Sequence, residues 1–167
     1  APPGAATTVN VRVTTPGGTS PIAVADQYTY VTPAPTVTSL APTSGPTAGG
    51  TSVTITGTNL TGATAVAFGA PPSPSFTVIT PTTITATAPA GAAIVDVRVT
   101  TPGGTSPITP GDQYTYVTPV PAVTSLSPTS GPTAGGTSVT ITGTNLTGAT
   151  AVAFGATPAT SFTVNNA

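Results

Sequence analysis

The sequence has 167 residues and very little charge: two arginines and three aspartates give a formal net charge of −1. It contains no lysine, glutamate, histidine, cysteine, methionine or tryptophan. A disulfide framework is therefore excluded, and so is an electrostatic nucleic-acid interface, which needs several basic side chains to displace counterions. Because the residues most used in acid–base and nucleophilic catalysis are missing, we expect no enzyme and no catalytic, cofactor-binding or metal-binding residue.

No apolar run approaches the roughly 20 residues that span a bilayer, so we expect no membrane insertion in this segment. The absence of an initiator methionine and of a signal peptide indicates a mature or excised segment of something longer. Apolar residues alternate with Thr and Ser, which is typical of strands and predicts a folded chain despite 21 prolines and 19 glycines. So few charges favour either an ordinary low-charge secreted domain or a subunit of an assembly.

In chain order, residues 1–31 predict a β-hairpin. Valines alternate with polar residues over 9–13, a Thr-Pro-Gly-Gly-Thr turn follows at 15–19, and a second alternating strand covers 26–31. The same hairpin recurs in residues 95–117, which places Arg and Asp residues at equivalent positions in both.

The next stretch, residues 35–70, returns almost unchanged as residues 121–156. The only differences are Thr36 against Ala122 and Ala41 against Ser127. The chain is therefore a repeat array with a period of 86 residues.

Two prolines in each of the linkers 32–35 and 118–121 favour short, stiff connections between successive repeats. We expect three segments. They are 1–32, the C-terminal part of a repeat; 33–118, a complete repeat; and 119–167, the N-terminal part of a further repeat.

The complete repeat predicts seven short strands separated by turns, with no helical periodicity. They are expected at 36–40, 51–57, 64–69, 75–79, 82–88, 94–101 and 112–117. A sandwich of two antiparallel sheets buries one face of each strand. The expected core is Val37, Leu40, Val53, Ile55, Leu60, Val66, Phe68, Phe76, Val78, Ile84, Val95, Val97, Val99, Tyr114 and Tyr116.

Several spaced signatures occur in a characteristic order: PTVTSLAPTSGPTAGGTSVTITGTNL, then AVAFGA, TTITATAPAG and VDVRVTTPGGTS, closing on YTYV. Together they resemble the IPT/TIG family of immunoglobulin-like domains, which is shared by plexins, some transcription factors and many bacterial surface proteins. The resemblance implies an all-β fold of tandem Ig-like (IPT/TIG) sandwich repeats of 86 residues, arranged end to end. DNA-binding members of the family depend on basic loops, which this sequence lacks.

The two terminal segments are each part of a repeat, and neither contains the counterpart of residues 82–87. Each alone would expose apolar faces and unpaired strand edges. Three explanations are open: a segment cut from a continuous array, pairing of one copy with the next by strand complementation, or an arbitrary excision.

Four patterns point to specific chemistry. The run at 45–52 approaches a phosphate-binding loop, but Thr51 stands where the lysine belongs and no helix follows, so a turn is expected. Asp96 and Asp112 are the only carboxylates of one repeat, and acid–base catalysis of the glycosidase kind would need such a pair close together. We expect them several residues out of register on adjacent strands, which does not suit that role. A structural use is favoured: each Asp starts a strand or pairs with an Arg.

The linkers carry no acids for interdomain calcium. Asn59-Leu60-Thr61 and its copy at Asn145 fit the N-glycosylation pattern, although the Asn also suits a turn.

These observations favour a non-enzymatic structural protein that forms an extracellular or cell-surface rod or filament. Its expected partner is itself, as a head-to-tail homopolymer or a continuous repeat array. The alternative is an adhesin stalk or a carbohydrate-binding accessory module that contacts glycans or a host or cell surface. We expect no cofactor and no nucleic acid.

Overall fold

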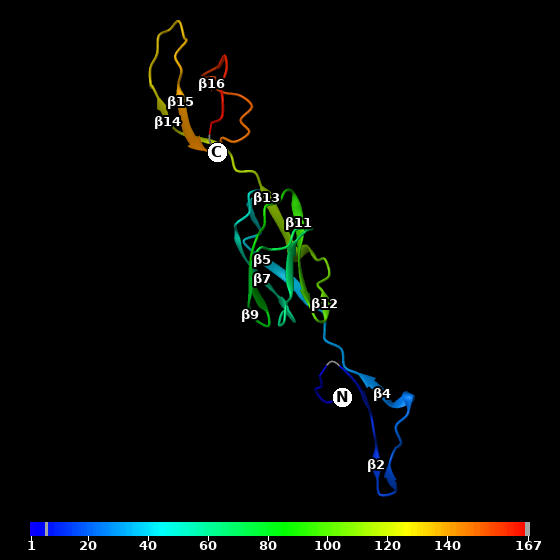
Figure 1. Cartoon of the computed structure of the whole chain (residues 1–167). Coiled ribbons are helices and arrows are strands. Elements are labelled where there is room, and N and C mark those ends of the chain that lie inside the picture. Colours follow the sequence, from blue (N-terminus) through cyan, green and yellow to red (C-terminus); the bar gives the residue numbers. More distant parts are fainter. Residues whose placement is uncertain (6, 166–167) are drawn as a thin grey trace. The chain divides into compact units, whose positions relative to one another are not determined.

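The computed structural model describes residues 1–5 and 7–165, which cluster into two compact units, Ala1–Val117 and Thr118–Ala167. Strands make up nearly all the regular structure (Figure 1). No helix in the part of the chain that the structure describes is long and apolar enough to cross a membrane. The predicted all-β fold class is confirmed.

The central repeat is a sandwich of two sheets. One sheet has the order β5-β7-β10-β9, with bounds Thr36–Ala41, Ser52–Thr58, Thr83–Thr87 and Phe76–Thr80. The other has the order β12-β11-β13-β6, with bounds Gly104–Thr105, Ile94–Thr101, Gln113–Val117 and Ser44–Pro46. A further strand, β8 (Ala65–Phe68), pairs antiparallel with β11. All pairs are antiparallel except β6, which runs parallel to β13.

All seven predicted strands are present, with bounds within two residues of those expected. Two short strands, β6 and β12, and the 3-10 turn η2 (Pro110–Asp112) were not predicted. The Ser-Gly-Pro sequence of β6 is typical of a turn, and it becomes a strand only because it pairs with β13, about 70 residues further on. A local pattern carries no information about such a pairing.

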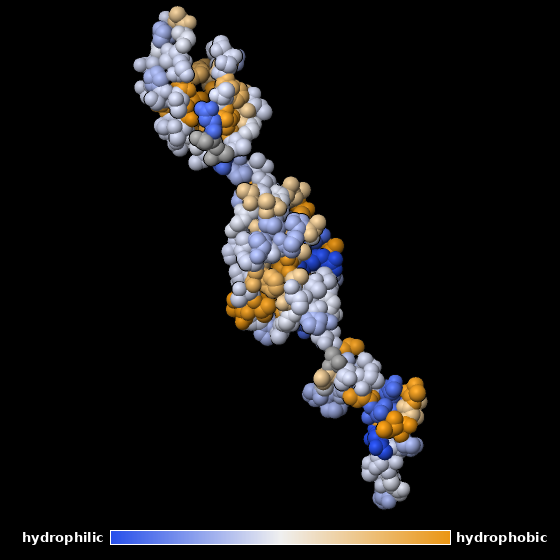
Figure 2. Space-filling model, in the orientation of Figure 1, coloured by the Kyte–Doolittle hydropathy of each residue, from blue (hydrophilic) through white to orange (hydrophobic). Residues whose placement is uncertain are grey.

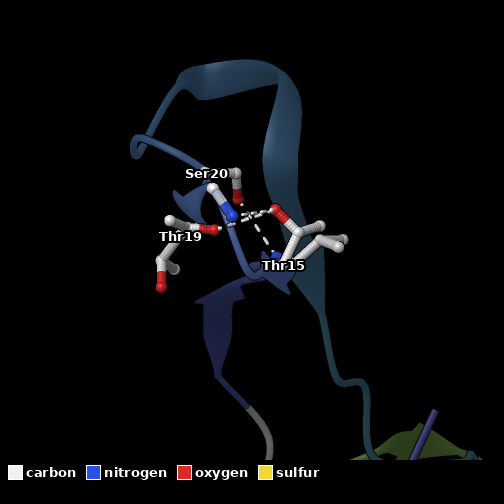
Figure 3. Close-up of a pocket in the computed structure, with 6 residues that line it drawn as sticks. Thr15, Thr19 and Ser20 are labelled. Atoms are coloured by element: carbon white, nitrogen blue, oxygen red, sulfur yellow. Dashed lines mark hydrogen bonds between the residues drawn. The ribbon is translucent and has the colours of Figure 1, made fainter.

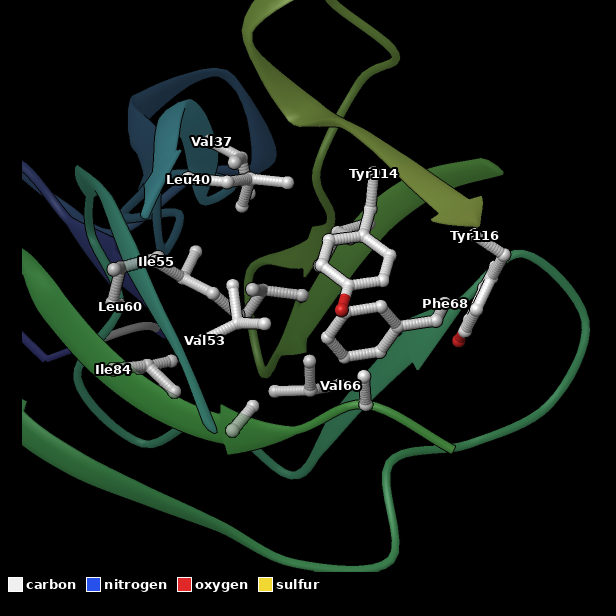
Figure 4. Packing of buried hydrophobic residues seen from close by; sticks show 14 residues of the cluster. Val37, Leu40, Val53, Ile55, Leu60, Val66, Phe68, Ile84, Tyr114 and Tyr116 are labelled. Atoms are coloured by element: carbon white, nitrogen blue, oxygen red, sulfur yellow. The ribbon is translucent and has the colours of Figure 1, made fainter. Parts of the chain in front are cut away.

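Alternation along the strands builds the core. In β7 every second residue is buried, because successive side chains of a strand point to opposite faces. Figure 4 shows the core side chains converging between the sheets, with Phe68 against Tyr114. Twelve of the predicted core residues are buried, whereas Phe76, Val78 and Val95 are only partly buried. Phe76 and Val78 lie on the edge strand β9, which is covered on one side only.

The N-terminal segment forms two short two-stranded sheets and a turn. β1 (Thr8–Asn10) pairs with β4 (Gln27–Thr29), β2 (Thr14–Thr15) pairs with β3 (Gly18–Thr19), and η1 (Val24–Asp26) precedes β4.

Residues 11–13 are not in a strand, although their counterparts lie in the middle of β11. In the central repeat β8 pairs with that part of β11, and no described strand pairs with 11–13. The continuous strand therefore depends on a partner from the other half of the repeat.

The C-terminal unit repeats the start of the sandwich. β14 (Ala122–Ser127) pairs with β15 (Thr140–Thr144), and β16 (Ala153–Phe154) pairs with β17 (Thr157–Pro158). The β14–β15 register, including its bulge, equals that of β5–β7 shifted by one repeat. This half of the fold therefore forms the same hairpin with and without the second half.

Candidate docking surfaces on the flanking segments

The N-terminal segment exposes side chains whose counterparts form the core of the central repeat. Val97 is completely buried, whereas its equivalent Val11 is 55% exposed. We call this surface the N-face; it consists of Val9, Val11, Val13 and Tyr28. Figure 2 shows apolar side chains at the surface of this segment.

The C-terminal unit has a corresponding surface. Phe68 is completely buried in the central repeat, whereas its equivalent Phe154 is 52% exposed. We call this surface the C-face; it consists of Val123, Leu126 and Phe154. Large exposed apolar patches on soluble proteins generally mark interaction sites.

The central repeat shows what covers each face when both halves are present. β8 lies against β11, with Phe68 opposite Val97, and the Phe68 and Tyr114 rings meet edge to face at 5.2 Å. The counterpart of β8 is in the C-terminal unit and the counterpart of β11 is in the N-terminal segment. The N-face and the C-face therefore correspond to the two halves of the core of the central repeat.

A hollow opens beside the N-face, at the end of the β2–β3 hairpin (Figure 3). It is lined by Val13, Thr15, Gly17, Gly18, Thr19 and Ser20. In the central repeat the counterparts Thr101 and Ser106 are buried. There the carbonyl group of Pro33 lies so close to Gly103 that any side chain at that position would overlap it. The interdomain linker thus occupies the equivalent place in the complete repeat.

The N-terminal segment holds its local geometry without the other half. The Arg12 guanidinium donates from Nε and Nη2 to the Ser20 carbonyl at 3.0 and 2.8 Å. Arg98 donates in the same way to Ser106 at 2.9 and 2.6 Å. Both guanidinium groups thus bind a backbone carbonyl of their own hairpin, and these hydrogen bonds do not support the hypothesis that the arginines pair with an Asp.

In the C-terminal unit a side-chain hydrogen bond likewise holds the linker without the other half of the repeat. Asn145 Nδ2 donates to the Val120 carbonyl at 3.1 Å, as Asn59 does to Ala34 in the central repeat. Both Asn residues have positive φ, 57° and 55°, which Asn tolerates better than most residues. The motif is interpreted either as an N-glycosylation site or as a turn. In the structure the Asn is a turn residue whose side chain also binds the linker.

The glycine-rich run at 45–52 is used internally. The amides of Thr47, Gly49 and Gly50 donate to carbonyls of the domain itself, at 3.1, 2.9 and 2.8 Å. Gly49 and Gly50 both have positive φ, and Gly45 lies directly over the Tyr114 hydroxyl, where a Cβ would overlap it. The run is a strand followed by a tight turn, and its amides do not converge on a phosphate.

The two carboxylates of the repeat are closer than the sequence predicted. Asp96 pairs with Gln113, so Asp112 is one residue beyond it, and the prediction of several residues out of register is wrong. Asp112 is buried, and its Oδ2 accepts a 2.9 Å hydrogen bond from the amide of Thr109, the N-cap residue of η2. Burial raises the pKa of Asp112, and Asp96 adds to the rise.

Asp112 thus lies directly before β13, in line with the hypothesis that each Asp starts a strand, whereas Asp96 is the third residue of β11 and does not. The Asp112 Oδ1 and the Tyr114 hydroxyl are buried without a hydrogen-bond partner within the described residues. Those residues also contain no group of three or more His, Cys, Asp or Glu side chains that could hold a metal ion.

The IPT/TIG domain family matches the chain at residues 35–116 and 121–167, and the chain belongs to this family. Similar solved structures include two of the plexin A4 extracellular region, at 30% and 29% identity. They cover 55% and 61% of this chain with TM-scores of 0.45 and 0.47, and the chain spans 9% of each.

A third similar structure is SGBP-B from a complex xyloglucan utilization locus in Bacteroides uniformis. It shares 23% identity, with 67% of this chain and 31% of that chain covered and a TM-score of 0.42. No curated protein sequence matches the chain. The family assignment therefore rests on the sequence signatures, and the Ig-like sandwich agrees with it.

Proposed function

We propose that the protein is a non-enzymatic, extracellular structural protein whose Ig-like repeats form a rod or filament. The segments 1–32, 33–118 and 119–167 are one complete repeat and two half-repeats. Each half-repeat is completed by complementary material, either from an adjacent copy of the chain or from continuing repeats of the same kind.

One observation carries this proposal: identical side chains are buried in the central repeat and exposed in the flanking segments. Val11 and Phe154 each expose more than half of their surface, whereas Val97 and Phe68 expose none. Fully burying one such side chain contributes about 1.5–3 kcal/mol, so several of them together provide a strong drive for association. Linker prolines and the Asn–carbonyl hydrogen bonds hold the repeat ends, which suits a mechanical role.

The alternative, an adhesin stalk or a carbohydrate-binding accessory module, has less support. A glycan site generally presents aromatic platforms on a stable surface. The exposed aromatics Tyr28, Phe154 and Phe162 belong instead to surfaces whose counterparts form the core or pack against it. A glycan array with saturable binding would favour this alternative.

The test is the assembly state of the purified chain and of single-charge variants. We expect the wild type to form elongated assemblies in electron microscopy, and Val11→Asp and Phe154→Asp to abolish them, because a carboxylate cannot be buried unpaired. The matched control is Thr142→Asp, which adds the same charge at an exposed position of β15. Dispersed monomers of the wild type, or assembly by Val11→Asp, would contradict completion of the half-repeats by adjacent copies of the chain.

A further inference from the structure

We infer that the occupant of the N-face is the C-face of a second copy of this chain, docked in the register of the central repeat. This inference rests on the proposed function and adds the partner and the residue pairs. The two faces are complementary halves of one repeat and both are present in every chain. A second copy therefore presents to each flank the residues that contact the same half in the central repeat.

The central repeat defines the register. Its two halves meet in an antiparallel pairing of β11 with β8 and in a parallel pairing of β13 with β6. Shifted by one repeat, the antiparallel pairs are Val11 with Phe154, Arg12 with Ala153, Val13 with Val152 and Thr14 with Ala151. The parallel pairs are Thr29 with Ser130, Tyr30 with Gly131 and Val31 with Pro132. In all seven pairs both residues are identical to those of the central repeat.

The hollow beside the N-face provides a second, separate match. In the central repeat the linker carbonyl of Pro33 lies against Gly103, and the side chain of Ala34 is nearest to Gly104. The hollow retains both glycines, as Gly17 and Gly18. The linker of a second copy has proline again at the first position, Pro119. The hollow is thus the seat for the linker that precedes the docking half.

Part of the geometry needed for docking in this register is already in place, whereas residues 11–13, 130–132 and 151–152 lie outside strands and join the ladder only on docking. The Tyr28 and Tyr30 rings already meet edge to face at 4.9 Å and 79°, as Tyr114 and Tyr116 do at 5.1 Å and 79°. Arg12, the only cation near the interface, is already bound to the Ser20 carbonyl. Because the tyrosine pair and Arg12 are preorganised, less conformational entropy is lost in ordering them on association.

One turn departs from this match. Gly111 lies so close to the Thr38 carbonyl that a Cβ would overlap it, and its equivalent in the N-terminal segment is Ala25. Thr109, which donates from Oγ1 to the Val37 carbonyl at 3.0 Å, is replaced by Ala23. The η1 turn therefore stands off the β14 strand of the second copy, and the strands and the linker carry the contact.

The contact joins different surfaces of the two copies, so it is heterologous. Each added copy presents a new free face, and a heterologous contact that does not close on itself generates an open filament.

Engineered disulfides test the register directly, because the chain contains no cysteine. One variant carries Thr14→Cys with Ala151→Cys, and a second carries Val13→Cys with Val152→Cys. Both variants are tested because neighbouring antiparallel pairs alternate in Cα separation, about 5.5 and 4.5 Å. A disulfide has a preferred Cα separation, so one of the two pairs suits it better than the other. The matched controls are Thr100→Cys with Ala65→Cys and Val99→Cys with Val66→Cys, which place the same pairs inside the central repeat.

The slipped control is Thr14→Cys with Ala153→Cys. A shift of two residues moves the partner by about 6.6 Å, beyond the reach of a disulfide. We expect a ladder of covalent oligomers on a non-reducing gel from an in-register pair. From the slipped pair we expect at most about a tenth as much.

Each other outcome overturns part of the account. Assembly of the wild type without a ladder, or equal ladders from the in-register and slipped pairs, would overturn the register and leave the proposed function standing. A monomer with an internal disulfide would overturn the second copy as the occupant. A wild type that stays monomeric and gives no ladder would remove both the inference and the homopolymer form of the proposed function.

Discussion

Asp112 is a buried carboxyl group whose protonation is coupled to folding. Burial is the largest cause of its raised pKa, and the nearby Asp96 adds to the rise, whereas the Thr109 amide opposes it. The native state therefore holds this proton more tightly than the unfolded state, in which the pKa is near its ordinary 3.8. The stability contributed by protonated Asp112 is present below 3.8 and is lost as the pH rises through the raised value.

We therefore predict that Asp112→Asn removes a pH dependence of the central repeat. In the wild type, the Asp112 contribution to the free energy of unfolding falls as the pH rises from below 3.8. The amide keeps an acceptor for Thr109, so the variant still folds, and it has no proton to lose in this range. Calorimetric unfolding of both proteins at a series of pH values measures the difference. The same slope in both proteins would contradict the prediction.

At the residue scale the sequence predicted which side chains are buried better than it predicted which polar side chains lie close together. The core valines of β7 and β11 follow from alternation alone, since period 2 sends every second side chain inward. The neighbouring positions of Asp96 and Asp112 depend on the pairing of two strands, which composition and spacing do not define.

At the scale of the element, η1 and η2 are the same turn with different side chains. Their N-cap residues have nearly identical φ and ψ, −140° and 161° in one and −140° and 159° in the other. One difference is the Cβ of Ala25, which stands where Gly111 contacts the Thr38 carbonyl.

We predict that Ala25→Gly strengthens self-association, because it allows η1 to approach β14 of the next copy as closely as η2 approaches β5. Sedimentation velocity over a concentration series should show a dissociation constant lower by about 2- to 10-fold, a gain of roughly 0.4–1.4 kcal/mol. The converse control is Gly111→Ala, which should destabilise the central repeat by about 1–3 kcal/mol through overpacking. Unchanged or weaker association of Ala25→Gly would contradict the docking of η1 against β14.

Strand prediction succeeded where the pattern is local and failed where it is not. The seven main strands follow from alternating Val, Ile and Thr between Gly and Pro turns. β6 could not be predicted because its Gly and Pro favour a turn and its strand geometry comes from β13. The interruption of the first strand at residues 11–13 has the same cause. The equivalent part of β11 is held in strand geometry by hydrogen bonds to β8, and no described strand pairs with residues 11–13.

For the whole molecule, the repeat period indicated that the flanking segments are halves of one fold. The candidate site could be predicted to that extent: which residues would be exposed follows from which half is present. The hollow at Gly17 and Gly18 could not be predicted from the sequence. In the central repeat the linker residue Pro33 lies against the equivalent glycine, Gly103, and no described residue takes that place beside Gly17.

Amide hydrogen exchange of the assembled protein tests the central claim most directly, because the central repeat is an internal reference in every chain. The account predicts that residues 9–13 are protected nearly as strongly as residues 95–99, and residues 152–154 nearly as strongly as residues 66–68, since both pairs of segments then lie in the same ladder. Rapid exchange of residues 9–13 and 152–154 in assembled material, with 95–99 and 66–68 fully protected, would contradict it.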